Sequence, residues 1–286
     1  MTSISYHRHG HHRPRAGAAR VPAYALPQRV SQGRVIRAEW TKLRTQPSAL
    51  WAGAASAGLA AGFGILYSLL REARPPHGAG AVASFDPTAI SLSGIQLAQI
   101  AVGVLGAMLI TSEYSSGMIR STFAAVPRRL PVLWGKAAIA LGAVFAMSVP
   151  AVLVAFFAGQ SILAKVGLDI SFGQPGVARA VLGSAAYLAL AGVLGVGLGA
   201  LLRNTAAAVT ALFGLLFGLQ LLAGMIPGSA GVTLEKFMPS TAGQAIASVY
   251  PDPGTSLGPW TGLGLFACYT IVVLALAARR MSRGDA

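Results

Sequence analysis

The chain has 286 residues, of which 54% are hydrophobic and only 10% are charged. Soluble domains carry about 25% charged residues, so this composition excludes an ordinary soluble globule and predicts an integral membrane protein. The 22 Lys and Arg outnumber the 8 Asp and Glu. We attribute this excess to basic loops beside a membrane rather than to nucleic-acid binding, because no basic segment is interleaved with aromatic residues.

Residues 1–28 are rich in His, Arg, Pro, Ala and Gly and are predicted to be a disordered basic cytosolic tail. The "HRHGHH" stretch within it is compatible with weak metal binding, but a solvated basic tail is the simpler interpretation. We expect no signal peptide, because the first apolar run begins near residue 49. The chain is predicted to bind no metal or cofactor of its own.

Residues 29–48 are predicted to form an amphipathic helix on the cytosolic leaflet. Ile36, Trp40 and Leu43 recur at helical spacing, and Pro47 ends the helix before the first span. Tryptophan suits the headgroup layer, and arginine can reach lipid phosphate. The segment is either an ordinary basic anchor or an interface that packs against a partner. Its predicted interface residues are Arg37, Glu39, Trp40, Lys42 and Arg44.

Six charge-free windows follow, each long enough for one helix across a ~30 Å hydrocarbon core and none long enough for two. A β-barrel would need alternating apolar and polar residues, whereas these windows are continuously apolar. The fold is therefore predicted to be all-α, a polytopic six-helix transmembrane domain over residues 49–282. We place the six spans near 49–70, 89–111, 137–160, 180–202, 206–227 and 257–278.

The basic residues of the loops predict the orientation. Most Lys and Arg fall in the N-terminal tail, the loop 112–136, the 203–205 turn and the C-terminus. Basic loops stay in the cytosol, so both termini and the loop 112–136 are predicted to be cytosolic and the segment 228–256 external. The other side would hold only Arg71, Arg74, Lys165, Arg179 and Lys236.

The predicted spans contain no Asp, Glu, Lys, Arg or His. Ion-coupled carriers usually keep such residues in the membrane, and neither H-E-x-x-H nor G-x-S-x-G occurs. No catalytic residue is therefore predicted. Gln96 and Gln99 lie three residues apart on one helix face. They either form hydrogen bonds between helices or line a possible substrate path.

The chain also has no phosphate-binding loop. Gly135 and Lys136 are followed by Ala137, and Leu130 stands where the first glycine of such a loop is required. An active transporter built on this chain would need a separate subunit to hydrolyse nucleotide.

The stretch "TSEYSSGMIRSTFAAVPRRLPVLWGK", residues 111–136, is the most polar part of the middle of the chain. Read as a helix from residue 113, it has a polar ridge flanked by apolar residues, which suits docking into a groove of another protein. The alternative is a basic surface loop without a partner. The residues predicted to make the contact are Glu113, Tyr114, Ser116, Gly117, Met118, Arg120, Arg128 and Arg129.

"RAEWTKLRT" before the first span and "SEYSSGMIRSTFAAVPRR…GK" between the second and third resemble the ABC-2 type permease family, in its actinobacterial form. The resemblance covers roughly residues 30–280. It implies a multi-pass exporter subunit of the bacterial cell membrane that forms a homodimer or heterodimer, contacts lipid, and binds a cytosolic ABC ATPase holding ATP and Mg. Residues 113–125 would be the coupling helix, 34–46 the connecting helix and 235–246 short external helices.

The predicted function is therefore the membrane-spanning permease subunit of an ATP-driven exporter, with the ATPase activity residing in a partner. The alternative is a membrane-embedded scaffold or immunity protein that moves nothing.

Overall fold

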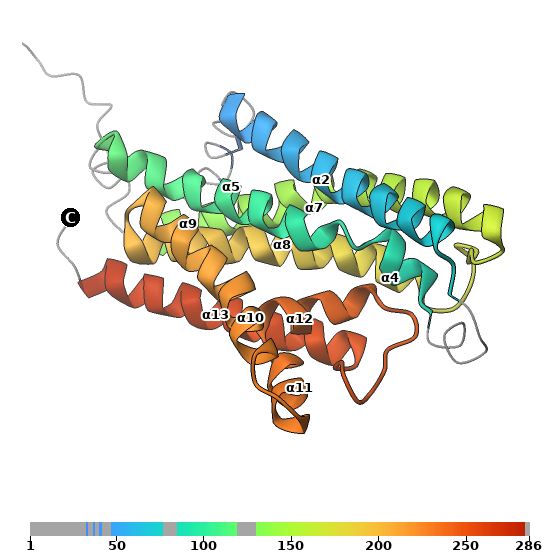
Figure 1. The fold of residues 1–286 in the computed structure, drawn as a ribbon. Coiled ribbons are helices and arrows are strands. Elements are labelled where there is room, and N and C mark those ends of the chain that lie inside the picture. Colours follow the sequence, from blue (N-terminus) through green and yellow to red (C-terminus); the bar gives the residue numbers. More distant parts are fainter. Residues whose placement is uncertain are drawn as a thin grey trace, which may run out of the picture. The chain divides into compact units, whose positions relative to one another are not determined.

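The structure is a computed structural model that describes residues 33, 37, 40, 41, 47–76, 85–118 and 130–283. All regular structure in this part of the chain is helical (Figure 1). Six helices are long and apolar enough to cross a membrane, which confirms the predicted all-α, six-span fold. The spans are α2 (Pro47–Ala73), α5 (Ile95–Ser115), α7 (Leu130–Leu163), α8 (Val177–Leu202), α9 (Thr205–Phe213) with α10 (Leu219–Gly224), and α13 (Pro259–Arg283).

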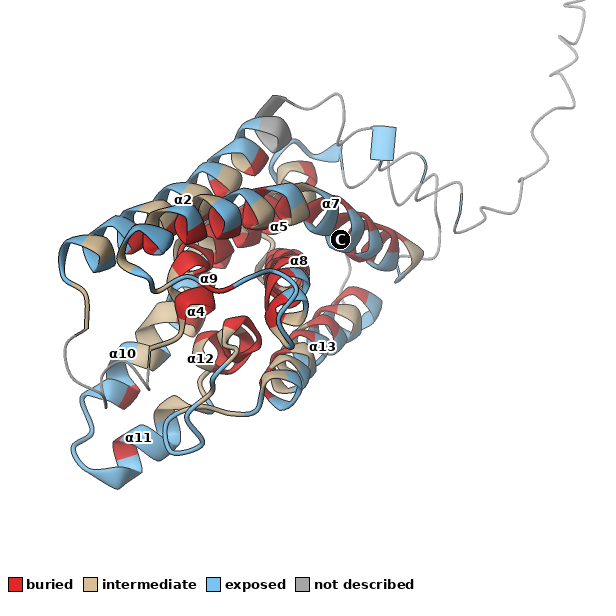
Figure 2. Cartoon of the chain, turned by 90° about the vertical axis from the view of Figure 1, so that its right-hand side faces the viewer, coloured by how far each residue is buried: buried red, intermediate tan, exposed pale blue. Residues whose placement is uncertain are grey.

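α8 is the central helix of the bundle. Of its most apolar window 78% is buried, against 28% for α2 and 22% for the α9–α10 span. α8 packs on α5, α7 and α13, and Figure 2 shows its ribbon, coloured mostly as buried, between them. The contact with α5 is close because both helices carry glycine there. A Cβ on Gly195 would collide with the carbonyl of Gly103, and one on Gly199 would crowd Ala107.

Spans that follow one another in the chain run antiparallel. Ser56 on α2 donates to the carbonyl of Ala98 on α5, whereas Gly64, further along α2, lies against the carbonyl of Ser91, which precedes α5. The alternation gives the bundle two ends. We call the end that holds residues 115–118, 130 and 203–204 the Arg203 end. The end that holds residues 74–76, 85–94, 164–176 and 225–258 is the Asp86 end.

The second span is interrupted near its start. It was predicted as one helix near 89–111, but α4 (Pro87–Ser91) and α5 are separated by a turn at residues 92–94. The Asp86 carboxylate caps α4 by accepting the N–H of Ala89 at 3.0 Å. Gly94 then lies directly against the carbonyl of Ala60 on α2, where no side chain fits. The turn therefore lets the chain cross α2 closely.

The third span begins earlier than its apolar window suggests. α7 starts at Leu130, not near residue 137, because Pro131 suits the first turn of a helix. This extension places Lys136 inside the helix. The other long helices also exceed their charge-free windows and take in Glu113 in α5 and Arg179 in α8. Each of these charged residues lies near a helix end.

The fifth span contains an irregular turn. A π-helical segment, η2 (Gly214–Gly218), separates α9 from α10. Beyond it, α11 (Ser229–Glu235) is largely exposed, whereas α12 (Pro239–Gln244) and η3 (Ala245–Ala247) pack against α13. Ala242 and Ile246 are fully buried there. The predicted external segment 228–256 thus includes a helical part that contributes to the core.

Candidate functional site

One polar residue of the predicted docking loop, Glu113, belongs to a buried ion pair at the Arg203 end. Glu113, in the last turns of α5, and Lys136, on α7, are separated by 2.9 Å between carboxylate oxygen and ammonium nitrogen. The side chains are only 4% and 2% exposed. Lys136 also donates to the carbonyl of Leu109 at 2.8 Å. Charges are buried at tolerable cost only when they are paired and hydrogen-bonded in this way.

The same end of α5 contacts the turn between α8 and α9. The guanidinium of Arg203 lies 5.6 Å from the ring centroid of Tyr114. Thr205 donates a 2.8 Å hydrogen bond to the hydroxyl of Thr111. Arg203 adopts a left-handed backbone conformation with φ 57°, which ends α8, and Asn204 caps α9 at once. The turn is therefore short and held to α5 by two side chains.

The residues beyond this anchored turn are exposed. Ser115 and Ser116 both donate to the carbonyl of Ser112, and Gly117 takes a left-handed conformation with φ 72° that ends α5. Met118 is 50% exposed and helical again. The predicted helix from residue 113 is consequently divided. Residues 113–115 are the last turn of α5, and Gly117 separates them from Met118.

The predicted contact residues thus fall into two groups. Glu113 is buried and Tyr114 is half-buried, whereas Ser116, Gly117 and Met118 are exposed. Arg120, Arg128 and Arg129 lie outside the described residues, as does the rest of the segment 119–129. The assignment of all eight as partner contacts stays a prediction.

The predicted interface helix is described at four positions. Residues 33, 37, 40 and 41 are helical, and the Thr41 hydroxyl donates to the carbonyl of Arg37, one turn earlier. A groove of about 450 Å³ separates this segment from the first half of α7. Trp40 and Arg37 are exposed at its wall. Glu39, Lys42 and Arg44 lie outside the described residues, and the disordered tail predicted at 1–28 does too.

Gln96 and Gln99 lie on the core side of the second span. Gln99 is fully buried, accepts a hydrogen bond from the Tyr187 hydroxyl on α8, and donates to the carbonyl of Gln96 at 2.8 Å. Gln96 itself is half-buried. The hydrogen bond from Tyr187 gives Gln99 the first of the two predicted roles, a hydrogen bond between helices. A role in a substrate path stays a prediction.

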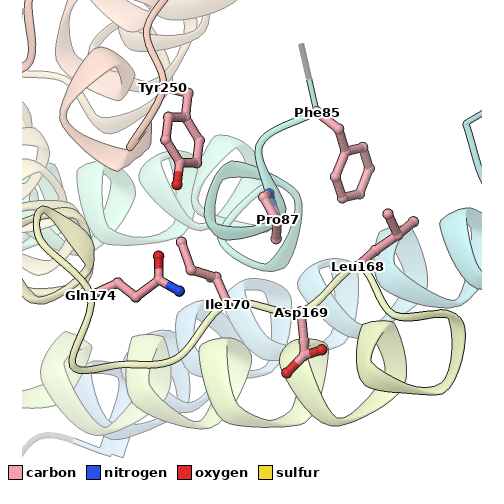
Figure 3. A pocket seen from close by; sticks show the side chains of 7 residues that line it. All are labelled: Phe85, Pro87, Leu168, Asp169, Ile170, Gln174 and Tyr250. Atoms are coloured by element: carbon pink, nitrogen blue, oxygen red, sulfur yellow. The ribbon is translucent and has the colours of Figure 1, made fainter. Parts of the chain in front are cut away.

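A shallow cavity of about 300 Å³ opens at the Asp86 end (Figure 3). Figure 3 shows Tyr250 pointing toward Gln174, while the carboxylate of Asp169 points away from both. The polar residues that line the cavity are exposed, whereas Pro87 and Ile170 are buried. The full lining is Phe85, Pro87, Leu168, Asp169, Ile170, Gln174 and Tyr250.

The loop that carries Tyr250 is held in place by two charged residues. Asp86 accepts hydrogen bonds from the Ser248 hydroxyl at 2.7 Å and from the backbone N–H groups of Val249 at 2.7 Å and Tyr250 at 3.0 Å. Arg179 donates to the carbonyl of Ser248 at 2.9 Å. Sequence reasoning singled out neither residue. The sequence did contain one signal: Asp86 and Arg179 each lie just before a predicted span, at the end of the bundle predicted to be external.

Among the described residues, no three His, Cys, Asp or Glu side chains are grouped as metal ligands would be. The histidines of the N-terminal tail lie outside the described residues.

The chain is similar to a known protein family. A family model described as ABC-2 family transporter protein matches residues 35–219, which is more than half of the chain. The matched region begins in the interface segment and ends in the fifth span, so it includes the ion pair and the exposed residues beside it. No curated protein matches the chain significantly.

Proposed function

Because the chain belongs to the ABC-2 family of transporter proteins, we propose that it is the permease subunit of an ATP-driven exporter in a bacterial plasma membrane. Membership makes it a membrane transport component. The Arg203 end of the bundle supports the proposal of outward transport powered by a separate cytosolic ATPase. Two copies of the chain, or this chain and a related one, would form the complete membrane unit.

The observation that carries the proposal is the contrast between Glu113 and its neighbours. An exposed segment, Ser115–Met118, emerges directly from a turn of α5 that is held by an ion pair, a cation–π contact and a hydrogen bond. A partner that binds the exposed segment would therefore move α5 without first deforming a flexible loop. Helix-in-groove docking uses such an exposed apolar residue beside polar ones, here Met118 among serines.

The chain supplies binding and conformational change rather than chemistry in this proposal. The ATPase holds ATP and Mg, and closure of its subunits pushes on the Arg203 end. The spans then transmit the movement toward the Asp86 end, which would face outward. The sequence supports this orientation, because most Lys and Arg fall in the segment before α2, the segment between α5 and α7, the turn between α8 and α9, and the C-terminus.

A co-purification experiment tests the proposal. The tagged full-length chain is extracted from its native membranes, and any ATPase that is recovered with it is identified by mass spectrometry. Met118→Glu should reduce recovery at least tenfold by placing a charge in the apolar contact. Met225→Glu is the matched control, since Met225 is 73% exposed beyond the end of α10. Recovery of no ATPase with the wild-type chain would favour the scaffold alternative.

A further inference from the structure

The connection between α5 and α7 starts and finishes beside the same ion pair. Glu113 precedes the exposed segment by two residues, and Lys136 lies within two turns of the start of α7. Their charged groups are 2.9 Å apart and almost fully buried. The described residues on the two sides of the segment 119–129 therefore both adjoin this one buried contact.

This contact matters because α5 and α7 make few other direct contacts with each other. α5 and α7 each pack extensively on α2 and α8, and only sparsely on one another. Their relative position is therefore set mainly through third helices. At the Arg203 end, the Glu113–Lys136 pair joins them directly.

The pair also has more than one point of attachment. The Lys136 ammonium donates both to the Glu113 carboxylate and to the carbonyl of Leu109, four residues earlier on α5. Those two groups lie one helical turn apart. These two contacts hold Lys136 at one position along the axis of α5. They therefore restrain sliding of α7 past α5.

We propose that Glu113 and Lys136 are positioning residues that make the ends of α5 and α7 move as one body when a partner acts on the segment between them. The inference rests on the proposed function, because it takes the partner to be the coupled ATPase. Glu113 acts through Lys136 in this account rather than by touching the ATPase. Its 3% exposure leaves little surface for such a contact.

The chain contains a matched control pair. Glu72 and Lys165 also form an ion pair, with 3.2 Å between oxygen and nitrogen, but their side chains are 26% and 61% exposed. This pair joins α2 to η1 (Ala164–Val166) at the Asp86 end. Exposed pairs are weak because water and salt screen them. Glu72→Gln should therefore leave the helices at the Arg203 end unaffected.

The test measures the distance between spin labels at the ends of the two helices. Ser112→Cys and Leu130→Cys are introduced into the full chain with Cys268→Ser, so that only the two labelled sites react. Ser112 is half-buried and lies before the exposed segment that the ATPase would bind, and Leu130 is exposed. The chain is placed in lipid nanodiscs and measured alone, and then with the co-purified ATPase, with and without a non-hydrolysable ATP analogue.

The wild-type pair should give one narrow distance that does not change when the nucleotide-loaded ATPase binds. Glu113→Gln and Lys136→Gln should each add a second distance population that grows when the ATPase and nucleotide are present. A merely structural pair would broaden the distances equally with and without the ATPase. The exchanged pair, Glu113→Lys with Lys136→Glu, keeps opposite charges together and should reduce the second population at least twofold.

Three results would overturn the inference. One is an unchanged distance in both single variants, and another is a second population that ignores the ATPase. The third is loss of ATPase affinity in Glu113→Gln but not in Lys136→Gln, which would make Glu113 a direct contact. All three leave the proposed function intact. Failure of the wild-type chain to bind any ATPase would instead contradict the proposed function and this inference with it.

Discussion

Tyr187 on α8 donates its hydroxyl hydrogen to the side-chain oxygen of Gln99 on α5, and both residues are fully buried. The ring of Tyr187 also packs on Phe266 of α13, with 4.8 Å between centroids. One side chain thus joins three spans at the centre of the bundle. The bond identifies a structural role for Gln99, whichever further role the residue has.

Removing the Tyr187 hydroxyl should destabilise the bundle modestly. Tyr187→Phe leaves the Gln99 oxygen without its partner, and hydrogen bonds between membrane helices contribute about 0.6 kcal/mol on average. We expect Tyr187→Phe to have a lower melting temperature than the wild-type chain, measured in detergent by intrinsic tryptophan fluorescence. Adding Gln99→Leu should recover most of the loss, because replacing both partners with apolar groups is nearly neutral. A double variant less stable than either single one would contradict this account of Gln99.

The close approach of α5 and α8 gives a second prediction. A methyl group at Gly195 would collide with backbone atoms of Gly103, which cannot rotate away. Gly195→Ala should therefore cost about 1–3 kcal/mol, as overpacking of a core does. Gly58→Ala is the matched control, since a Cβ there meets nothing within 4 Å. Equal melting temperatures of the two variants in detergent would show that the helices do not pack as described.

A third prediction concerns the Asp86 end. Asp86→Ala removes the acceptor for Ser248, Val249 and Tyr250 together. Hydrogen bonds to a charged group contribute about 1.5–3 kcal/mol each, so the loop should open locally rather than the bundle unfold. Hydrogen exchange should become faster at residues 248–258. Asp169 is an exposed carboxylate at the same end, and Asp169→Asn should leave hydrogen exchange at residues 248–258 unchanged. An equally large increase in exchange in Asp169→Asn would refute the role of Asp86.

Much of the fold was predictable from the sequence because lipid imposes a simple rule. Backbone polar groups must be satisfied inside each span, so every charge-free window of sufficient length becomes a helix. The six spans follow from that rule alone. The same reasoning underestimated the lengths of several helices, α7 most of all, since a charged residue such as Lys136 can remain in a helix when another helix neutralises it.

The site was less predictable because it depends on contacts between helices. Helical periodicity placed Glu113 on a polar ridge, but it gave no information on α7, whose Lys136 buries Glu113 while Ser116 stays exposed. Glu113 and Lys136 are 23 positions apart and meet only through tertiary packing. The turn at residues 92–94 was equally hidden, because it reflects the approach of Gly94 to Ala60 rather than a local breaker such as proline.

The orientation of the Arg203 end tests the central claim most directly. In a Cys268→Ser background, a single cysteine at the exposed Ser116 is treated with a membrane-impermeant thiol reagent. Our account predicts no labelling in intact cells and rapid labelling in inverted vesicles, slowed when the ATPase is bound. Labelling of Ser116→Cys in intact cells would place the segment outside the cell, beyond the reach of any cytosolic ATPase, and would contradict the account.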